Sequence, residues 1–184
     1  MPEKSHHLGG RSPEYALLGF LYVEPSHGYS LHRQLVEELG HVWHVSQSQT
    51  YAILKRLLAQ GDIASTTQQQ DKLPARQLLH ITVSGRRRFR QWLKESSGSS
   101  VRAIRLEFIT RLYFAQKLFP KLTPRLIEAE AEDIIKAITR LELARRQIPP
   151  EQTFNRLSLE LRLQQLHAVM DWVVQCRKAF GIKS

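Results

Sequence analysis

Apolar residues along the first third of the chain recur at the spacing of short helices. This periodicity predicts helices over residues 12–23, about 29–39 and 46–60. Ser12, Pro13 and Glu14 start the first as N-cap, N1 proline and first-turn acid. This helix is apolar on most sides, so we expect both of its faces to be buried, for example between a core and a partner subunit. Three short helices with tight connections are typical of a helix-turn-helix module.

Two β-prone stretches follow the third helix. Residues 62–67 and 75–82 flank a polar, turn-like segment at 68–74. A fourth amphipathic helix is predicted over 86–96. A β-hairpin directly after the third helix predicts a winged helix, with a plain surface ribbon as the alternative.

The rest of the chain is predicted to be helical. Helices are expected over residues 101–119, from Thr123 onward, and over 153–180. The last two keep apolar residues at alternating spacings of four and three, which is typical of an antiparallel hairpin or of a helix exchanged with a second chain. Because three helices alone leave many apolar faces uncovered, we expect a homodimer; an intramolecular bundle is the alternative.

The predicted fold class is therefore mainly α. A winged helix-turn-helix domain, made of helices and a two-stranded β-wing, precedes an all-helical dimerisation domain. The serine- and glycine-rich stretch near residue 97 marks the linker. The predicted parts are a flexible arm at 1–11, a DNA-binding domain at 12–96, a linker at 97–100, and a dimerisation and effector domain at 101–184.

The third helix presents a polar face without an acidic residue. Ser46 is a good N-cap, and one apolar stripe follows it. Such a face suits the DNA major groove, where Gln can read adenine and Lys can meet guanine or phosphate. A polar face on an ordinary globular domain is the alternative. The expected DNA contacts on this helix are Ser46, Gln47, Ser48, Gln49, Tyr51 and Lys55.

The charge of the chain favours a polyanionic partner. The formal net charge is +10 and the isoelectric point about 10.1. Residues 46–96 hold nine basic and three acidic residues, a net charge of +6. Nucleic acid is the first candidate partner and an anionic membrane surface the second. Lys72 and Arg76, on the wing, are expected to touch phosphate.

Composition also bears on the compartment. No run of about 18 apolar residues is present, so we expect no membrane-spanning segment. The N-terminus lacks the apolar core of a secretory signal. The single Cys176 excludes an internal disulfide, which fits a reducing environment. We therefore expect a cytoplasmic protein.

Catalysis and metal binding have little support. No metalloprotease, phosphate-loop, serine hydrolase or dinucleotide-binding motif is present. His41 and His44 are spaced as two metal ligands on a helix would be, but no cysteine or carboxylate accompanies them. Packing is the expected role of Cys176, with redox sensing as the alternative. We predict neither an enzyme nor a metal or cofactor site.

Aromatic residues suggest a candidate effector pocket. They lie on helices that are expected to meet between the two domains, where a cavity could bind a flat apolar ligand. Simple core packing is the alternative reading. The candidate lining residues are Tyr15, Trp92, Phe108, Tyr113 and Phe114.

Several short motifs, in order and in spacing, resemble the PadR family of bacterial transcriptional regulators. The likeness covers about residues 13–95, and the run from Glu107 to Ala115 resembles the start of the helical C-terminal domain of longer PadR-like proteins. The motifs are Tyr15-Ala16-Leu17-Leu18-Gly19, His27-Gly28-Tyr29, Trp43-x-x-Ser46, Tyr51-x-x-Leu54-x-Arg56-Leu57, Gly61, Pro74-x-Arg76 and Ile81-Thr82-x-x-Gly85.

The resemblance implies a homodimeric repressor whose third helix enters the major groove. Carried over by position, Ser46 and Tyr51 are the expected helix contacts and Arg76 the wing contact. The family also implies a small aromatic or lipophilic effector that releases DNA. The chain departs from the family pattern, so its operator cannot be copied from relatives. The departures are Ser48, Ala52, Leu58, Gln77 and Leu79.

The leading hypothesis is a sequence-specific regulator that binds double-stranded DNA as a symmetric dimer. Its operator would be a palindrome with half-sites about 10 base pairs apart or a multiple of that. The alternative is a winged-helix module that binds protein and not DNA.

Overall fold

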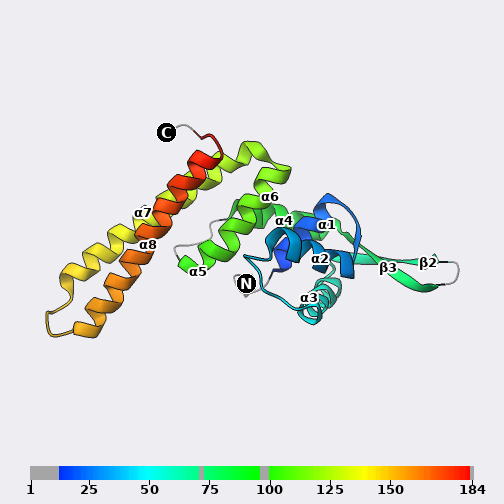
Figure 1. Cartoon of the computed structure of the whole chain (residues 1–184), viewed down its shortest axis with the longest axis horizontal. Coiled ribbons are helices and arrows are strands. Elements are labelled where there is room, and N and C mark those ends of the chain that lie inside the picture. The colour runs from blue at the N-terminus through cyan, green and yellow to red at the C-terminus, as the bar shows by residue number, and fades with distance from the viewer. Residues whose placement is uncertain (1–12, 71–72, 96–99, 183–184) are drawn as a thin grey trace, which may run out of the picture. The chain divides into compact units, whose positions relative to one another are not determined.

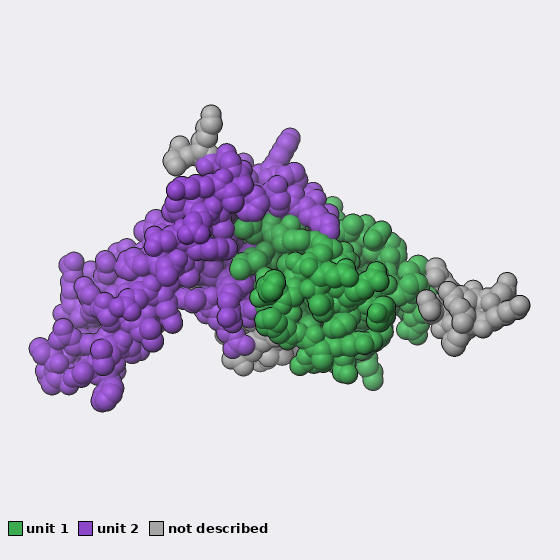
Figure 2. Space-filling model, in the orientation of Figure 1, with its two compact units in different colours: residues 1–95, 109–114 green, residues 96–108, 115–184 purple. Residues whose placement is uncertain are grey.

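The computed structural model describes residues 13–70, 73–95 and 100–182, and its contacts define two compact units (Figures 1 and 2). Unit 1 holds residues 1–95 together with 109–114. Unit 2 holds residues 96–108 together with 115–184.

Unit 1 is a winged helix. Three helices precede a β-hairpin and a fourth helix, and Figure 1 shows the hairpin extending from the helices. The sheet is antiparallel in the order β1-β3-β2. The predicted mainly α fold with a β-wing is thus confirmed. The elements are α1 (Glu14–Val23), β1 (Ser26–His27), α2 (Gly28–Leu39), α3 (Gln47–Ala59), β2 (Ile63–Gln70), β3 (Leu73–Ile81) and α4 (Val83–Lys94).

The hairpin strands are longer than predicted. β2 runs to Gln70 and β3 begins at Leu73, so much of the segment expected to be a turn is paired strand. Polar residues are typical of turns, but here the backbone forms the hairpin ladder whatever the side chains. The short strand β1 was not predicted; it pairs Ser26 with Leu79.

The fourth helix starts earlier than predicted because Thr82 caps it. The Thr82 hydroxyl accepts from the Gly85 N–H at 3.1 Å, so α4 begins at Val83. A Cβ on Gly85 would lie 2.0 Å from the Asp62 carbonyl oxygen. Glycine therefore allows α4 to pack directly against the backbone that leads into β2.

The core of unit 1 surrounds α1. Residues 16–21 of this helix are all buried, which agrees with the prediction that both of its faces are covered. Burial of each such apolar side chain stabilises the fold by about 1.5–3 kcal/mol. The helices packed around α1 bury Leu31, Leu35, Leu39, Ile53, Leu54, Leu57, Phe89, Trp92 and Leu93.

Residues 109–114, the first turns of α6 (Ile109–Leu118), belong to unit 1. Phe114 is fully buried there, and a Cβ on Gly19 would lie 2.4 Å from its ring. Arg111 is 2% exposed, and its Nε donates to the Trp92 carbonyl oxygen at 2.9 Å. These turns of α6 thus complete the core around α1 and α4.

Unit 2 is helical, and its two long helices form an antiparallel hairpin. Arg177 near the end of α8 pairs with Glu128 near the start of α7 at 2.5 Å, and Arg145 pairs with Glu160 at 3.1 Å at the other end. This is the hairpin alternative of the prediction. The helices are α5 (Val101–Ala103), η1 (Ile104–Phe108), η2 (Pro120–Leu122), α7 (Thr123–Gln147) and α8 (Thr153–Ala179), with residues 115–118 of α6.

The segment predicted as one regular helix from 101 to 119 contains a π-helical stretch. Residues 104–108 form η1 between α5 and α6. Periodicity in the sequence cannot resolve such a local change in winding. The π-helical stretch changes which side of the helix the residues after it face, relative to those before it.

Candidate nucleic-acid interface

A capping box fixes the start of α3. The Ser46 hydroxyl accepts from the Gln49 N–H at 3.2 Å, and the Gln49 side-chain oxygen accepts from the Ser46 N–H at 2.8 Å. The predicted N-cap is confirmed. Both side chains are exposed, but each already has a partner inside the helix, so contact with a base by either would compete with the cap.

The remaining outward face of α3 is polar and exposed, as its periodicity predicted. Tyr51 is 45% exposed, while Ile53, Leu54 and Leu57 on the opposite side are buried. Leu58 is half-buried. The exposed residues of this face, which we call the α3 face, are Gln47, Ser48, Tyr51, Ala52 and Lys55.

Contacts with α2 hold α3 in place. The Thr50 hydroxyl lies 3.0 Å from His32 Nδ1 and donates to the Ser46 carbonyl oxygen at 3.2 Å. A Cβ on Gly28 would lie 2.9 Å from Cε1 of Tyr51. The Tyr51 ring therefore packs on the glycine at the start of α2, which limits where its hydroxyl can point.

An ion-pair network, not anticipated from the sequence, joins α1, α3, α4 and the turn before β2. Glu14 pairs with Arg56 at 2.8 Å and with Arg88, and Arg88 also pairs with Asp62. Burial alone would lower the pKa of Arg88, but the hydrogen bond to Asp62 and the charge of Glu14 outweigh it and raise that pKa. Arg88 therefore stays charged and fixes α4 to the rest of unit 1.

This network changes the interpretation of the charge of residues 46–96. Two of the nine basic residues counted there, Arg56 and Arg88, are neutralised by Glu14 and Asp62. Glu14 lies outside the counted segment, so the sequence alone could not show this. Of the other basic residues of this segment that the structure describes, the exposed ones are Lys55 on α3 and Arg86, Arg87, Arg90 and Lys94 on α4.

The basic face of α4 is partly ordered by Tyr22. Arg86 and Arg90 lie 5.0 and 5.5 Å from the centre of its ring, and Arg90 Nε donates to its hydroxyl at 2.7 Å. Cation–π contacts of this kind hold guanidinium groups in place without neutralising them. The face is hollowed along Val83, Arg86, Arg87, Arg90, Gln91, Lys94 and Glu95.

Lys72 lies outside the described residues. The backbone of Arg76 pairs with that of Gln68 in the hairpin, but the structure does not describe the Arg76 side chain. Contact of both residues with phosphate stays a prediction.

Four of the five predicted effector-site aromatics pack within unit 1. Tyr15 stacks on Trp92 with ring centres 4.5 Å apart, and Phe114 and Tyr113 pack edge to face at 4.8 Å. Phe108 lies in unit 2, where the centre of its ring is 6.0 Å from the centre of the Trp172 ring. Neither of the hollows described for this structure is lined by these residues.

Three polar features of the aromatic residues in unit 1 could not be predicted from the sequence. The guanidinium of Arg111 lies 5.0 Å from the centre of the Trp92 ring. The indole N–H of Trp92 is buried without a hydrogen-bond partner among the described residues. Burial raises the pKa of Tyr15, and Arg88 partly opposes that rise. Only packing between residues far apart in sequence could reveal these features.

The residues considered for metal binding or redox chemistry are not part of α3. His44 and His41 are exposed, and no group of three or more candidate ligands occurs among the described residues. Cys176 is buried in α8, and burial raises its pKa. In the described part of the chain no helix is both long and apolar enough to cross a membrane.

This geometry, an exposed third helix beside a β-wing, defines a winged helix-turn-helix fold. Residues 17–91 match the model of the transcriptional regulator PadR-like family. The negative transcriptional regulator PadR of Bacillus subtilis (strain 168) is 31% identical over 101 residues, 55% of this chain. Residues 17–91 of the chain are therefore similar to the PadR-like family, as the sequence motifs predicted. The match spans 55% of the length of that curated relative.

Solved structures with a similar fold include two from bacterial species. Bacillus subtilis PadR in complex with operator DNA is 23% identical, with a TM-score of 0.45, and the match covers 91% of this chain and 98% of that one. A Streptococcus mutans protein is 21% identical, also with a TM-score of 0.45, covering 89% and 97%.

Proposed function

We propose that the chain is a sequence-specific DNA-binding repressor whose α3 face enters the major groove. The observation that carries this proposal is the α3 face itself, which is exposed, polar and free of acidic residues. Its capping box and its contacts with α2 preorganise it for binding. Ser48 and Tyr51 are the proposed base-reading groups, and Lys55 the proposed phosphate contact.

Capping divides the predicted contacts into two kinds. Gln47 takes no part in the capping box, so its exposed side chain can read an adenine edge, whereas Ser46 and Gln49 hold the helix start. We propose that Ser46 and Gln49 act mainly by fixing the first turn of α3. The backbone N–H groups of that turn would then face a DNA phosphate, where the helix dipole favours an anion.

We propose a homodimer assembled through unit 2. The hairpin exposes large apolar side chains near its loop, and such side chains cost free energy in water unless a partner covers them. Phe154 is 87% exposed, Leu157 60%, Leu161 56% and Leu143 55%. A symmetric dimer would bring two α3 faces to a palindromic operator. A cytoplasmic location follows from this function.

We also propose that a small aromatic or lipophilic effector releases the DNA. Bacillus subtilis PadR has been solved in complex with p-coumaric acid. In this chain the unpaired indole N–H of Trp92 beside the Tyr15 ring offers a donor and a flat apolar surface. The proposed subsite is therefore Tyr15 and Trp92; Phe108, Tyr113 and Phe114 would have packing roles.

Selection from a pool of random duplexes tests the DNA-binding proposal. The full chain should enrich a palindrome, and binding should weaken steeply as salt rises. The matched control is Arg33→Gln, which changes an exposed basic residue of α2 that pairs with Glu37 and should enrich the same site. Binding without any enriched sequence would contradict the proposal and favour the protein-binding module.

A further inference from the structure

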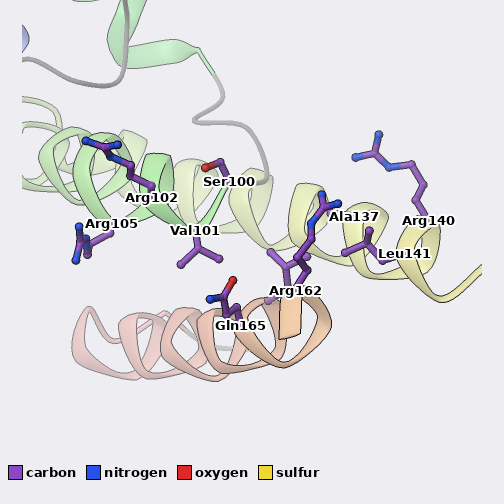
Figure 3. A pocket seen from close by; sticks show the side chains of 10 residues that line it. Ser100, Val101, Arg102, Arg105, Ala137, Arg140, Leu141, Arg162 and Gln165 are labelled. Atoms are coloured by element: carbon purple, nitrogen blue, oxygen red, sulfur yellow. The ribbon is translucent and has the colours of Figure 1, made fainter. Parts of the chain in front are cut away.

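Unit 2 contains a hollow of about 770 Å³ that is lined by three helical segments (Figure 3). A volume of this size is within the range of small-molecule sites. Residues of α5 and η1 form one side, and residues of α7 and α8 form the others. The lining residues are Ser100, Val101, Arg102, Arg105, Ala137, Arg140, Leu141, Arg162, Gln165 and Leu166.

The lining is strongly cationic. It contains four arginines and no acidic residue. None of the four is paired with a carboxylate within the described ranges, although Arg145 and Arg177 on the same two long helices do pair with Glu160 and Glu128. Like charges gathered around one hollow repel each other, and a bound anion removes that repulsion. The unpaired arginines therefore favour an anionic occupant.

The floor of the hollow is apolar. Ala137 and Leu166 are each 4% exposed, and Val101 and Leu141 are half-buried. In Figure 3, Gln165 points from α8 toward Val101, with Arg162 one turn away. Arg102 and Arg105 lie toward one end of the hollow and Arg140 toward the other. An apolar floor between cationic ends suits a ligand with an apolar body and charged groups.

We propose that this hollow binds a small organic dianion, with a phosphate or paired carboxylates attached to an apolar body. Arginine forms paired hydrogen bonds with both groups, since its planar guanidinium matches the geometry of their oxygens. The apolar body would lie on Ala137 and Leu166. The site is separate from the Tyr15 and Trp92 subsite, and the inference does not rest on the proposed DNA binding.

Isothermal titration calorimetry on the full chain, without DNA, tests this. Phenyl phosphate and benzene-1,3-dicarboxylate separate the two anion chemistries; inorganic phosphate supplies charge alone, and benzyl alcohol the apolar body alone. We expect at least one aromatic dianion to bind tenfold or more tightly than inorganic phosphate, and benzyl alcohol to show no binding. Equal affinity for phenyl phosphate, the dicarboxylate and inorganic phosphate would overturn the proposal.

Variants place the binding in the hollow. Arg162→Gln should weaken the dianion about tenfold, and Arg105→Gln gives a second, independent variant on another helical segment. The matched controls are Arg156→Gln, exposed on α8 outside the hollow, and Arg87→Gln on the basic face of α4. Circular dichroism confirms folding of each variant. An equal loss of affinity in hollow and control variants, or none in either, would contradict the assigned site.

Discussion

The indole N–H of Trp43 donates a buried hydrogen bond of 2.8 Å to the hydroxyl of Thr110. Trp43 lies just before the cap of α3, and Thr110 lies in the first turn of α6, 67 residues further along the chain. This bond secures the entry to α3 with a residue that follows the linker. Residues 109–114 are therefore part of the unit that presents α3.

Thr110→Val should destabilise unit 1. The substitution keeps the shape of the side chain but leaves the Trp43 indole N–H buried without this partner, which costs about 1–3 kcal/mol. Urea denaturation measures the change in the free energy of unfolding. The control is Thr139→Val on α7, whose hydroxyl bonds to Ile135 at an exposed site. If both substitutions lowered the free energy of unfolding equally, the hydrogen bond from Trp43 would not stabilise unit 1 more than an exposed one does.

Arg88→Met should destabilise unit 1 more than the loss of an ordinary surface pair does. It removes the shared partner of Glu14 and Asp62, of which Asp62 is 4% exposed. Loss of one partner of a fully buried pair costs about 3–5 kcal/mol. We expect less here, because the Arg88 side chain is 30% exposed. Arg33→Met, which breaks the exposed pair with Glu37, should cost below about 1 kcal/mol in the same thermal or urea unfolding experiment.

Two glycine-to-alanine substitutions should separate stability from DNA contact. Gly19→Ala drives a methyl group into the buried Phe114 ring and should cost about 1–3 kcal/mol of unfolding free energy. Gly28→Ala meets the edge of the half-exposed Tyr51 ring, which can move, so the stability should change little. Because the ring then shifts on α3, Gly28→Ala should weaken DNA binding several-fold. A fully stable Gly28→Ala protein with unchanged affinity would show that the position of Tyr51 does not matter.

Cys176 should be unreactive in the folded chain. Burial raises the pKa of its thiol, so less of the reactive thiolate forms at pH 8 than in the unfolded chain. A thiol reagent should label the native protein much more slowly than the protein in urea. Because the folded chain favours the protonated thiol, the contribution of Cys176 to the free energy of unfolding is complete below the ordinary cysteine pKa. This contribution is lost as pH rises through the higher pKa of the folded state. Equal labelling rates in the two states would contradict burial.

Local patterns in the sequence predicted the start and the exposed face of α3 better than they predicted the contacts around that helix. Ser46 and the apolar stripe of α3 predicted where the helix starts and which face is exposed, because capping and periodicity are properties of neighbouring residues. The motifs from Tyr15 to Gly85 predicted the similarity to the PadR-like family that residues 17–91 show. The roles of individual residues in DNA contact stay predictions.

Contacts between distant residues could not be predicted in this way. The pairing of Glu14 with Arg56 and Arg88, and the bond between Trp43 and Thr110, join positions 42 to 74 residues apart. Nothing in the local spacing indicates these partners. For the same reason the sequence placed residues 109–114 with the helical domain, whereas they pack with unit 1.

The most direct test of the proposed α3 face is the salt dependence of affinity for the selected palindrome, measured for Ser48→Ala, Lys55→Gln and the control Arg33→Gln. Lys55→Gln should weaken all sequences alike and flatten the slope of log affinity against log salt by about one, while Arg33→Gln should change neither. Ser48→Ala should cost about 1–3 kcal/mol and relax preference at one base pair with the slope intact. If both α3 variants bind with the affinity, sequence preference and slope of the control, α3 does not lie in the groove.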